Sequence, residues 1–301
     1  MPIPSSVSSC KDQEYLEVSD IDLVELLDRF EPELKRRYLE ITAKLRASNR
    51  LQEIEDLVAA GRWGEAVAGL EEAAEELSSE FRSVFYFVAL AVQDVIRAAK
   101  PFTFDITHFG VQRLFTGLER DLVEIFRQSA IAAMQDFRRF GTHHVRDAIG
   151  LSAEQIRRLA SYRGALLAPS RQRGSEEPPR PVSQQVRDRQ IEAMLIQLRG
   201  EQANRMGTWL AQLAIQTGAN LALGQAVEFG ALTFNDIWRE WFTRQDERVR
   251  GTHRPMHLQR RRLGSPFETG GGEALMYPGD PHGSDKETRG CRCGLRIILA
   301  T

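Results

Sequence analysis

Apolar residues recur every three or four positions through most of the first 230 residues, which is the spacing of one face of an α-helix. Ser19 and Asp20 precede the first such face and are suitable N-caps. Pro32 lies inside it and has no amide hydrogen to donate, so we expect a kink or a break into two helices near Glu31. The apolar positions of this face are Leu23, Leu27, Phe30, Leu34, Tyr38, Ile41 and Leu45.

Two more long helical patterns follow, joined by a short connector between Phe102 and Phe109. The first is ended by Pro101, and the second stops near Gly141. Three long amphipathic helices with short connections are typical of a helical bundle. The apolar positions of the two patterns are Leu70, Ala74, Leu77, Phe81, Val84, Val88, Val92 and Val95, and then Leu114, Leu118, Leu122, Ile125, Phe126, Ala133 and Phe137.

The next helix begins at a capping box, in which Ser152 is the N-cap and Gln155 lies three residues later. It runs to about Leu167. A last helical pattern covers roughly residues 186–229. Glycines at 200, 207 and 218 fall inside that pattern, so the sequence leaves open whether it forms one helix or two.

The periodicity changes from Phe234 onwards, where aromatic and polar residues alternate. Residues 237–243 are therefore predicted to form a strand, with a short helix as the alternative, and a second strand is expected around residues 257–263. The apolar segment 296–299 could pair with either of them. The predicted fold class is mainly α, a long-helix bundle followed by a small C-terminal α+β module. Residues 1–170 form the N-terminal helical region, 171–184 a linker-like stretch rich in proline, and 185–301 a helix plus the C-terminal module.

Charge is unevenly distributed along the chain, although the net charge of its 301 residues is only −2. Residues 1–80 hold 9 basic against 19 acidic side chains, and residues 239–301 hold 12 against 8. The basic end permits contact with nucleic acid but does not require it. Three cysteines are too few for a disulfide framework and suit a reducing compartment. We expect no signal peptide, because the N-terminus lacks a basic region followed by an apolar one. We also expect no membrane span, because no apolar run approaches about 18 residues.

Cys291 and Cys293 are the clearest candidates for chemistry. One residue separates them, so in an extended segment both thiols lean to the same side. Two thiolates and an imidazole are typical zinc ligands. We therefore predict a zinc site formed by His253, Cys291 and Cys293, with His257, His282 or Asp246 as candidates for a further ligand. The alternative is that the cysteines are small buried hydrophobic residues or free thiols.

Two further interpretations concern the same segment. Cys291, His253 and Asp246 have the residue types of a nucleophile, a base and an orienting group, which would make a hydrolase. The alternating charges of Asp246, Arg248 and Arg250 favour instead an internal knot of hydrogen bonds and ion pairs that fixes the loop.

Aromatic and basic residues nearby have simpler interpretations. At least one of Trp238 and Trp241 is expected in the core. The cluster Arg260–Arg262 is expected on a solvated face, with DNA phosphate as the alternative contact.

Taken in order, these residues resemble the C-terminal domain of the Mu F-like head morphogenesis proteins of tailed bacteriophages, also called minor head or minor capsid proteins. The resemblance covers roughly residues 230–299. It departs from the family pattern at His257-Leu258 and at Gly290, which precedes the first cysteine of the pair. The matching positions are Trp241, Asp246-x-Arg248-x-Arg250-x-x-His253-x-x-Met256, Pro266-Phe267, Tyr277-Pro278-Gly279-Asp280-Pro281 and Cys291-Arg292-Cys293.

The resemblance implies a component of the virion or prohead that is in the host cytoplasm during assembly. Its expected partners are the portal protein and other head or scaffold proteins, with packaged DNA as a further one. It would act in head assembly, DNA packaging or DNA delivery, and not as an enzyme. The alternative is a metal- or cysteine-dependent hydrolase acting in head maturation.

Overall fold

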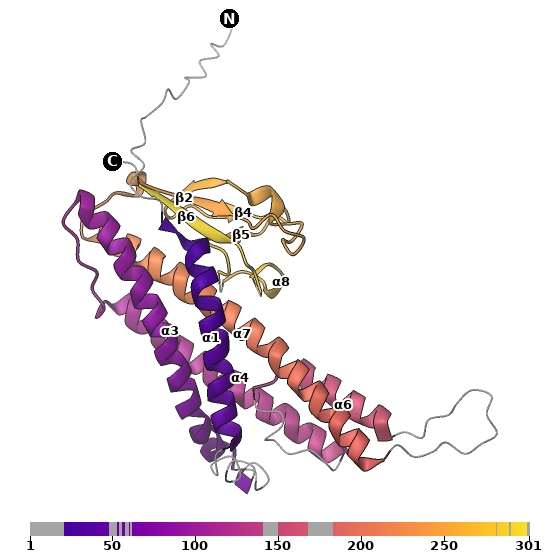
Figure 1. Cartoon of the computed structure of the whole chain (residues 1–301). Helices are drawn as coiled ribbons and strands as arrows, with labels where there is room; N and C mark the ends of the chain where they lie inside the picture. Colours follow the sequence, from indigo (N-terminus) through magenta and orange to yellow (C-terminus); the bar gives the residue numbers. More distant parts are fainter. Residues whose placement is uncertain are drawn as a thin grey trace, which may run out of the picture.

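The chain folds into long helices with a small sheet region at one end (Figure 1), as this computed structural model shows. It describes residues 21–47, 62–140, 150–167, 183–280, 282–288 and 290–299, and positions 53, 56, 57 and 60. The predicted fold class is confirmed. The helices are α1 (Leu23–Ala47), α3 (Trp63–Ala99), α4 (Phe109–Phe140), α6 (Ala153–Leu167), α7 (Gln184–Glu228) and the short α8 (Asp285–Thr288).

Helix α1 runs without a break through Pro32, so the predicted division into two helices is wrong. One face of α1 is buried along its whole length, and this packing outweighs the hydrogen bond that proline cannot make. The predicted caps Ser19 and Asp20 lie outside the described residues. Asp22 caps the helix in the structure, since its Oδ1 accepts a hydrogen bond from the amide of Val24 at 2.8 Å.

Helix α7 is a single helix of 45 residues, which answers the question left open by its glycines. It packs along both α1 and α3. A Cβ atom on Gly207 would lie 2.9 Å from the backbone of Lys35 in α1, and one on Gly218 would lie 2.8 Å from the Phe85 carbonyl in α3. These two glycines therefore serve close helix packing and do not interrupt the helix.

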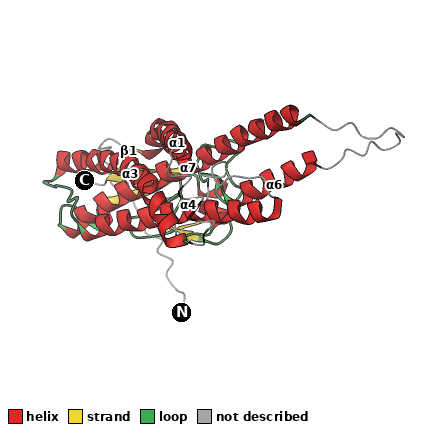
Figure 2. Cartoon of the chain, turned by 90° about the horizontal axis from the view of Figure 1, so that it is seen from below, coloured by secondary structure: helices red, strands yellow, loops and turns green. Residues whose placement is uncertain are grey.

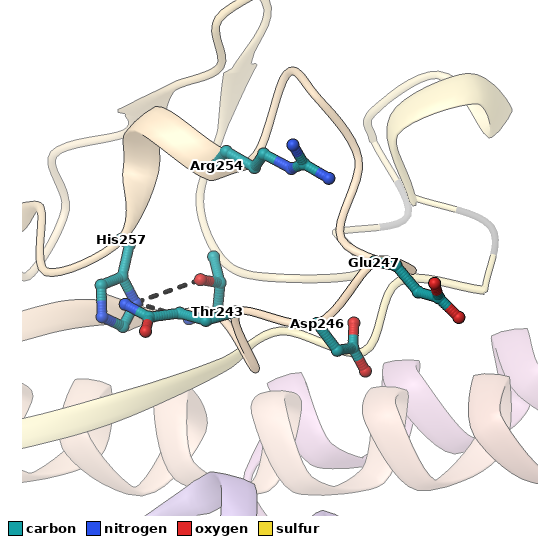
Figure 3. Close-up of a pocket in the computed structure, with 6 residues that line it drawn as sticks. Thr243, Asp246, Glu247, Arg254 and His257 are labelled. Carbon is teal, nitrogen blue, oxygen red and sulfur yellow. Dashed lines mark hydrogen bonds between the residues drawn. The ribbon is translucent and has the colours of Figure 1, made fainter.

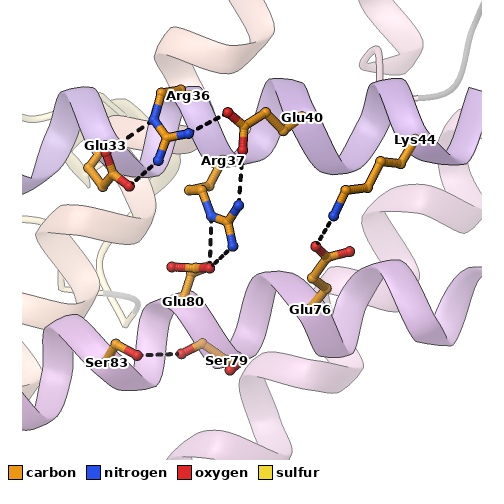
Figure 4. Close-up of polar contacts among 9 residues, drawn as sticks. All are labelled: Glu33, Arg36, Arg37, Glu40, Lys44, Glu76, Ser79, Glu80 and Ser83. Atoms are coloured by element: carbon orange, nitrogen blue, oxygen red, sulfur yellow. Dashed lines mark hydrogen bonds and ion pairs between the residues drawn. The ribbon is translucent and has the colours of Figure 1, made fainter.

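Ion pairs fix the position of α1 against α3 (Figure 4). Arg37 binds Glu80 through two of its nitrogens, and Lys44 Nζ lies 2.6 Å from Glu76. Beneath them, Leu34, Tyr38 and Ile41 face the core. The apolar contacts supply most of the stabilisation, and the exposed ion pairs select the register of the two helices.

Helix α6 begins at the predicted capping box. The Ser152 amide donates to Gln155 Oε1 at 3.0 Å, and the Gln155 amide donates back to Ser152 Oγ at 3.3 Å. The hydroxyl of Tyr38 in α1 donates to the carbonyl of Gly150 at 2.6 Å, which holds this start against the bundle. Figure 2 shows α6 beside the N-terminal part of α7.

A four-stranded sheet forms the C-terminal module together with long loops. Three of its strands overlap the segments predicted as strands, and the fourth, Ile21–Asp22, was not predicted. Its strand order is β1-β6-β2-β3, and every neighbouring pair is antiparallel. A separate two-stranded ribbon, β4 with β5, lies in the loops. The strands are β1 (Ile21–Asp22), β2 (Ile237–Phe242), β3 (Arg260–Arg262), β4 (Phe267–Glu268), β5 (Ala274–Leu275) and β6 (Gly294–Leu299).

Segments from both sides of the predicted linker share one core. Helices α1 and α3 pack on α7, and β1, which precedes α1, pairs with β6 near the C-terminal end of the chain. Residues 171–182 of the linker-like stretch lie outside the described residues, and Ser183 is the N-cap of α7. Among the described helices, none is long and apolar enough to cross a membrane.

Candidate metal centre

His253, Cys291 and Cys293 meet inside the C-terminal module. The sulfur atoms of Cys291 and Cys293 each lie 3.6 Å from Nδ1 of His253. All three ligand atoms lie within 4.8 Å of one another, and each residue is at most 3% exposed. The structure therefore brings together the three residues predicted as ligands, and they could hold a metal ion.

Local structure explains why these side chains converge. His253 lies at the start of the short 3-10 helix Arg254–Met256, and its amide donates to the carbonyl of Arg250 at 3.0 Å. The two cysteines lie in the loop segment that directly precedes β6, and the sulfur atoms of both face the same nitrogen of His253. Trp241 from β2 is fully buried, as predicted for at least one of the two tryptophans, and its ring packs edge-on against His253 at 5.4 Å.

Glu287 supports the histidine from behind, and the sequence interpretation missed it. Its Oε2 lies 3.0 Å from Nε2 of His253 and accepts a hydrogen bond from the Thr252 hydroxyl at 2.7 Å. The carboxylate is 3% exposed. A metal-binding histidine commonly has a carboxylate at its second ring nitrogen, which fixes the ring orientation. The sequence contained no signal for this contact beyond an acidic residue four positions before Cys291.

The two thiols lose their protons unequally. A hydrogen bond from Cys293, together with the neighbouring His253, lowers the pKa of Cys291 well below its usual value. The Cys291 thiolate and burial raise the pKa of Cys293. Two thiolates in one buried site repel each other, and a metal ion bound there would supply the compensating charge.

A cavity of about 10 Å³ adjoins the three residues. That volume corresponds to about one water molecule, so it accommodates a single ion or water and no organic substrate. The lining residues are Asp246, Arg248, Val249, Arg250, His253, Gly290, Cys291, Arg292 and Cys293.

The candidates for a further ligand lie outside this group of three. His257 lines a separate, wider pocket with Asp246, Glu247 and Arg254 (Figure 3), and its Nδ1 lies 3.1 Å from the Thr243 hydroxyl. His282 is on the surface and its Nδ1 lies 3.0 Å from Asp280. Asp246 lines the cavity, but its carboxylate lies outside the group of three ligands.

Asp246 stabilises the loop instead. Its Oδ1 accepts from the Arg248 amide at 3.1 Å, and its Oδ2 lies 3.2 Å from Arg292. This geometry matches the internal knot expected from the alternating charges. It differs from the hydrolase interpretation in one respect, because the carboxylate next to His253 belongs to Glu287 and not to Asp246.

Arg239 is a second buried residue that the sequence interpretation missed. Its guanidinium is 1% exposed and donates to the carbonyls of Met276 at 2.7 Å and Ser265 at 2.8 Å. It also donates to the Asn220 side chain on α7 at 3.2 Å. Burial lowers the pKa of Arg239 to about 10, so it remains charged at neutral pH. One side chain thereby joins β2, two loops and the helical bundle.

The three consecutive arginines of β3 also make contacts within the module. Arg260 Nε lies 2.7 Å from the buried carboxylate of Glu240, and Arg262 lies over the ring of Trp238 at 4.4 Å. Arg261 donates to the carbonyl of Arg260. These contacts position the strand, while Arg260 is exposed and Arg261 and Arg262 are half-exposed, as expected for a solvated face.

Helix α7 reaches the metal centre through Gln212. Its Nε2 donates to the carbonyls of Cys293 and Pro278, and the side chain is 3% exposed. Gly279 has a φ of +76° and lies close against this glutamine, where a Cβ atom would be 2.7 Å away. The bundle thus contacts the backbone of a metal-ligand candidate directly.

Comparison of the chain with protein-family models, with curated proteins and with solved structures gives no match.

Proposed function

We propose that this chain is a minor head morphogenesis protein of a tailed bacteriophage, of the Mu F-like type, which acts as a portal-associated adaptor in the virion or prohead. One observation carries the proposal. The residues of the family-like motifs, distant in sequence, pack into one buried centre. Trp241 lies between His253 and Phe267, whose rings are 5.4 and 5.3 Å away. Asp280 accepts from the Met276 amide at 2.8 Å.

The contacts favour an adaptor over an enzyme. The side chains of Asp246, Asp280 and Gln212 each form hydrogen bonds with backbone groups of the module, and these hydrogen bonds hold the loops in place. Small modules with long loops need such links because they bury little apolar surface. A rigid module on a long helical platform suits docking to a portal or scaffold protein during head assembly, DNA packaging or DNA delivery.

We further propose that the bound metal is zinc. A tetrahedral zinc ion with bonds of about 2.3 Å to sulfur and 2.05 Å to nitrogen places those two atoms roughly 3.6 Å apart. Both observed sulfur-to-Nδ1 distances are 3.6 Å. The zinc ion would link the loop that carries His253 to the segment that carries Cys291 and Cys293, and Glu287 would hold His253 in its orientation.

Elemental analysis of the purified chain tests the metal. We expect about one zinc per chain and almost none after the double change Cys291→Ser with Cys293→Ser. Cys10→Ser is the matched control because it removes the third cysteine of the chain, which lies far from this pair in sequence. Equal zinc content in all three proteins would refute the assignment.

Co-expression with the portal protein of the encoding phage tests the partner. We expect a stable complex by size-exclusion chromatography, and the chain in purified proheads or virions by mass spectrometry. A chain missing from both particles, or one that does not bind the portal protein, would contradict the proposed role.

A hydrolase remains the alternative because of one observation. Cys291, His253 and Glu287 follow one another at 3.6 and 3.0 Å, which is the order of nucleophile, base and orienting group. The burial of Cys291 and the small cavity count against it. Cleavage of a head protein that is lost in a folded, metal-containing Cys291→Ser variant would favour the hydrolase.

A further inference from the structure

A pocket of about 390 Å³ lies between two segments of the C-terminal module (Figure 3). One segment is the loop that follows β2, and the other is the 3-10 helix Arg254–Met256 with its C-cap. The lining residues are Thr243, Gln245, Asp246, Glu247, Arg254 and His257. A volume of this size is typical of sites that bind small molecules. The pocket can therefore hold an organic ligand, unlike the small cavity beside the two cysteines.

Hydrogen bonds hold the two segments against each other. The amide of Thr243 donates to Nδ1 of His257 at 3.2 Å. The amide of Leu258, the next residue, donates to the carbonyl of Trp241 at 2.7 Å. Because these contacts already order the walls of the pocket, a ligand would lose little affinity to the cost of ordering them.

Two residues beside the pocket have a left-handed backbone conformation. Gln245 has a φ of +56°, and Leu258 has a φ of +62°. In the described part of the chain, they are the two residues other than glycine with a positive φ. A side chain makes this conformation sterically costly, and residues that adopt it cluster at ligand-binding and active sites. The surrounding contacts thus hold the backbone here in a shape that these two residues do not favour by themselves.

Opposite charges share this pocket without pairing. Glu247 and Arg254 are both exposed and come from different segments. Among the described residues, neither side chain has a hydrogen-bond or ion-pair partner, so they do not pair with each other either. Asp246 differs, because its carboxylate is engaged by the Arg248 amide and by Arg292. One free carboxylate and one free guanidinium thus remain for groups of opposite charge on a ligand.

We infer that this pocket binds a small zwitterion, of the size of an amino acid or a dipeptide, with its carboxylate on Arg254 and its ammonium group on Glu247. A guanidinium group can bind a carboxylate through two parallel hydrogen bonds. The exposed amide of Gln245 offers both a donor and an acceptor to the neutral part of the ligand. The inference does not depend on the metal, since none of the three metal-ligand candidates lines the pocket.

Glycylglycine is a suitable probe, because it has an ammonium group and a carboxylate at opposite ends of one peptide unit. We expect it to bind the full chain in a saturable way, measured by saturation-transfer difference NMR. N-acetylglycylglycine lacks the ammonium group and glycylglycinamide lacks the carboxylate, so each should bind about fivefold more weakly or worse. No saturable binding of glycylglycine, or equal binding of all three compounds, would overturn the inference.

Two variants locate the two charges of the ligand. Arg254→Gln should remove the preference for glycylglycine over glycylglycinamide, and Glu247→Gln should remove its preference over N-acetylglycylglycine. Glu268→Gln is the matched control, because Glu268 is exposed on β4 and lies outside the pocket lining. It should leave all three affinities unchanged. Preferences in the two pocket variants that equal those of the control would contradict the proposed place of the ligand.

Discussion

The two ring nitrogens of His253 face different groups. Nδ1 faces both thiols at 3.6 Å, while Nε2 faces the carboxylate of Glu287 at 3.0 Å. A ring fixed from behind cannot rotate away from the proposed ion, and a carboxylate at Nε2 increases the basicity of the ligand nitrogen. Glu287 is therefore expected to contribute to metal affinity without touching the metal.

Glu287→Gln should weaken zinc binding about tenfold or more, because the amide keeps the shape of the side chain but removes its charge. Competition against a chromogenic chelator measures the affinity. Glu268→Gln is the matched control, since Glu268 lies in the same module but is exposed on β4. Zinc affinity that is the same in both variants would mean that Glu287 has only a packing role.

Arg239→Met should destabilise the module by about 3 kcal/mol, because carbonyls of Met276, Ser265 and Arg262 would lose a buried charged donor. Urea unfolding measures the change. Arg261→Met, on the edge strand, should cost under about 1 kcal/mol. A smaller effect at 239 than at 261 would show that the loops hold their positions without the buried guanidinium.

At the scale of elements, α7 determines how the helices approach one another. Gly207 and Gly218 lie eleven residues apart and face α1 and α3, respectively. Gly224, in contrast, has no atom within 4 Å of the place where a Cβ would be. The same residue type thus has opposite roles within one helix. Close packing requires it at 207 and 218, but at 224 it only weakens the helix.

Gly207→Ala and Gly218→Ala should each destabilise the chain by about 1–3 kcal/mol, since the added methyl group would press on backbone atoms of the neighbouring helix. Gly224→Ala should instead stabilise it by about 0.5–1 kcal/mol. Thermal unfolding followed by circular dichroism distinguishes the two classes. Destabilisation of similar size in all three variants would refute the close-approach explanation.

Periodicity was sufficient to predict the helices, the central strand and the capping box at Ser152, because each depends on residues close in sequence. The His253, Cys291 and Cys293 cluster was also predictable, since imidazole and thiolate groups are both typical zinc ligands. The other features depend on tertiary contacts, which the sequence pattern does not show. Packing keeps α1 continuous at Pro32, contact with other helices explains Gly207, and the site of Glu287 depends on how a loop closes over His253.

At the scale of the whole molecule, the proposed metal centre and the bundle are connected. Contacts that cross between them include the pairing of β1 with β6, the hydrogen bond from Gln212 to the carbonyl of Cys293, and the ion pair between Arg244 and Asp28 of α1. A ligand that binds only the folded module stabilises every element that must unfold with it. Zinc should therefore stabilise the long helices as well as the module.

Removing zinc with a chelator should lower the midpoint of thermal unfolding by about 5 °C or more when the helical signal is followed. Gln212→Leu should reduce that shift, because it cuts the contact between α7 and the Cys293 carbonyl. Gln197→Leu, exposed on the same helix, should leave the shift unchanged. Hydrogen exchange gives the contrary outcome. If chelation increased exchange in β2 and β6 but not in α7, the bundle and the module would unfold independently.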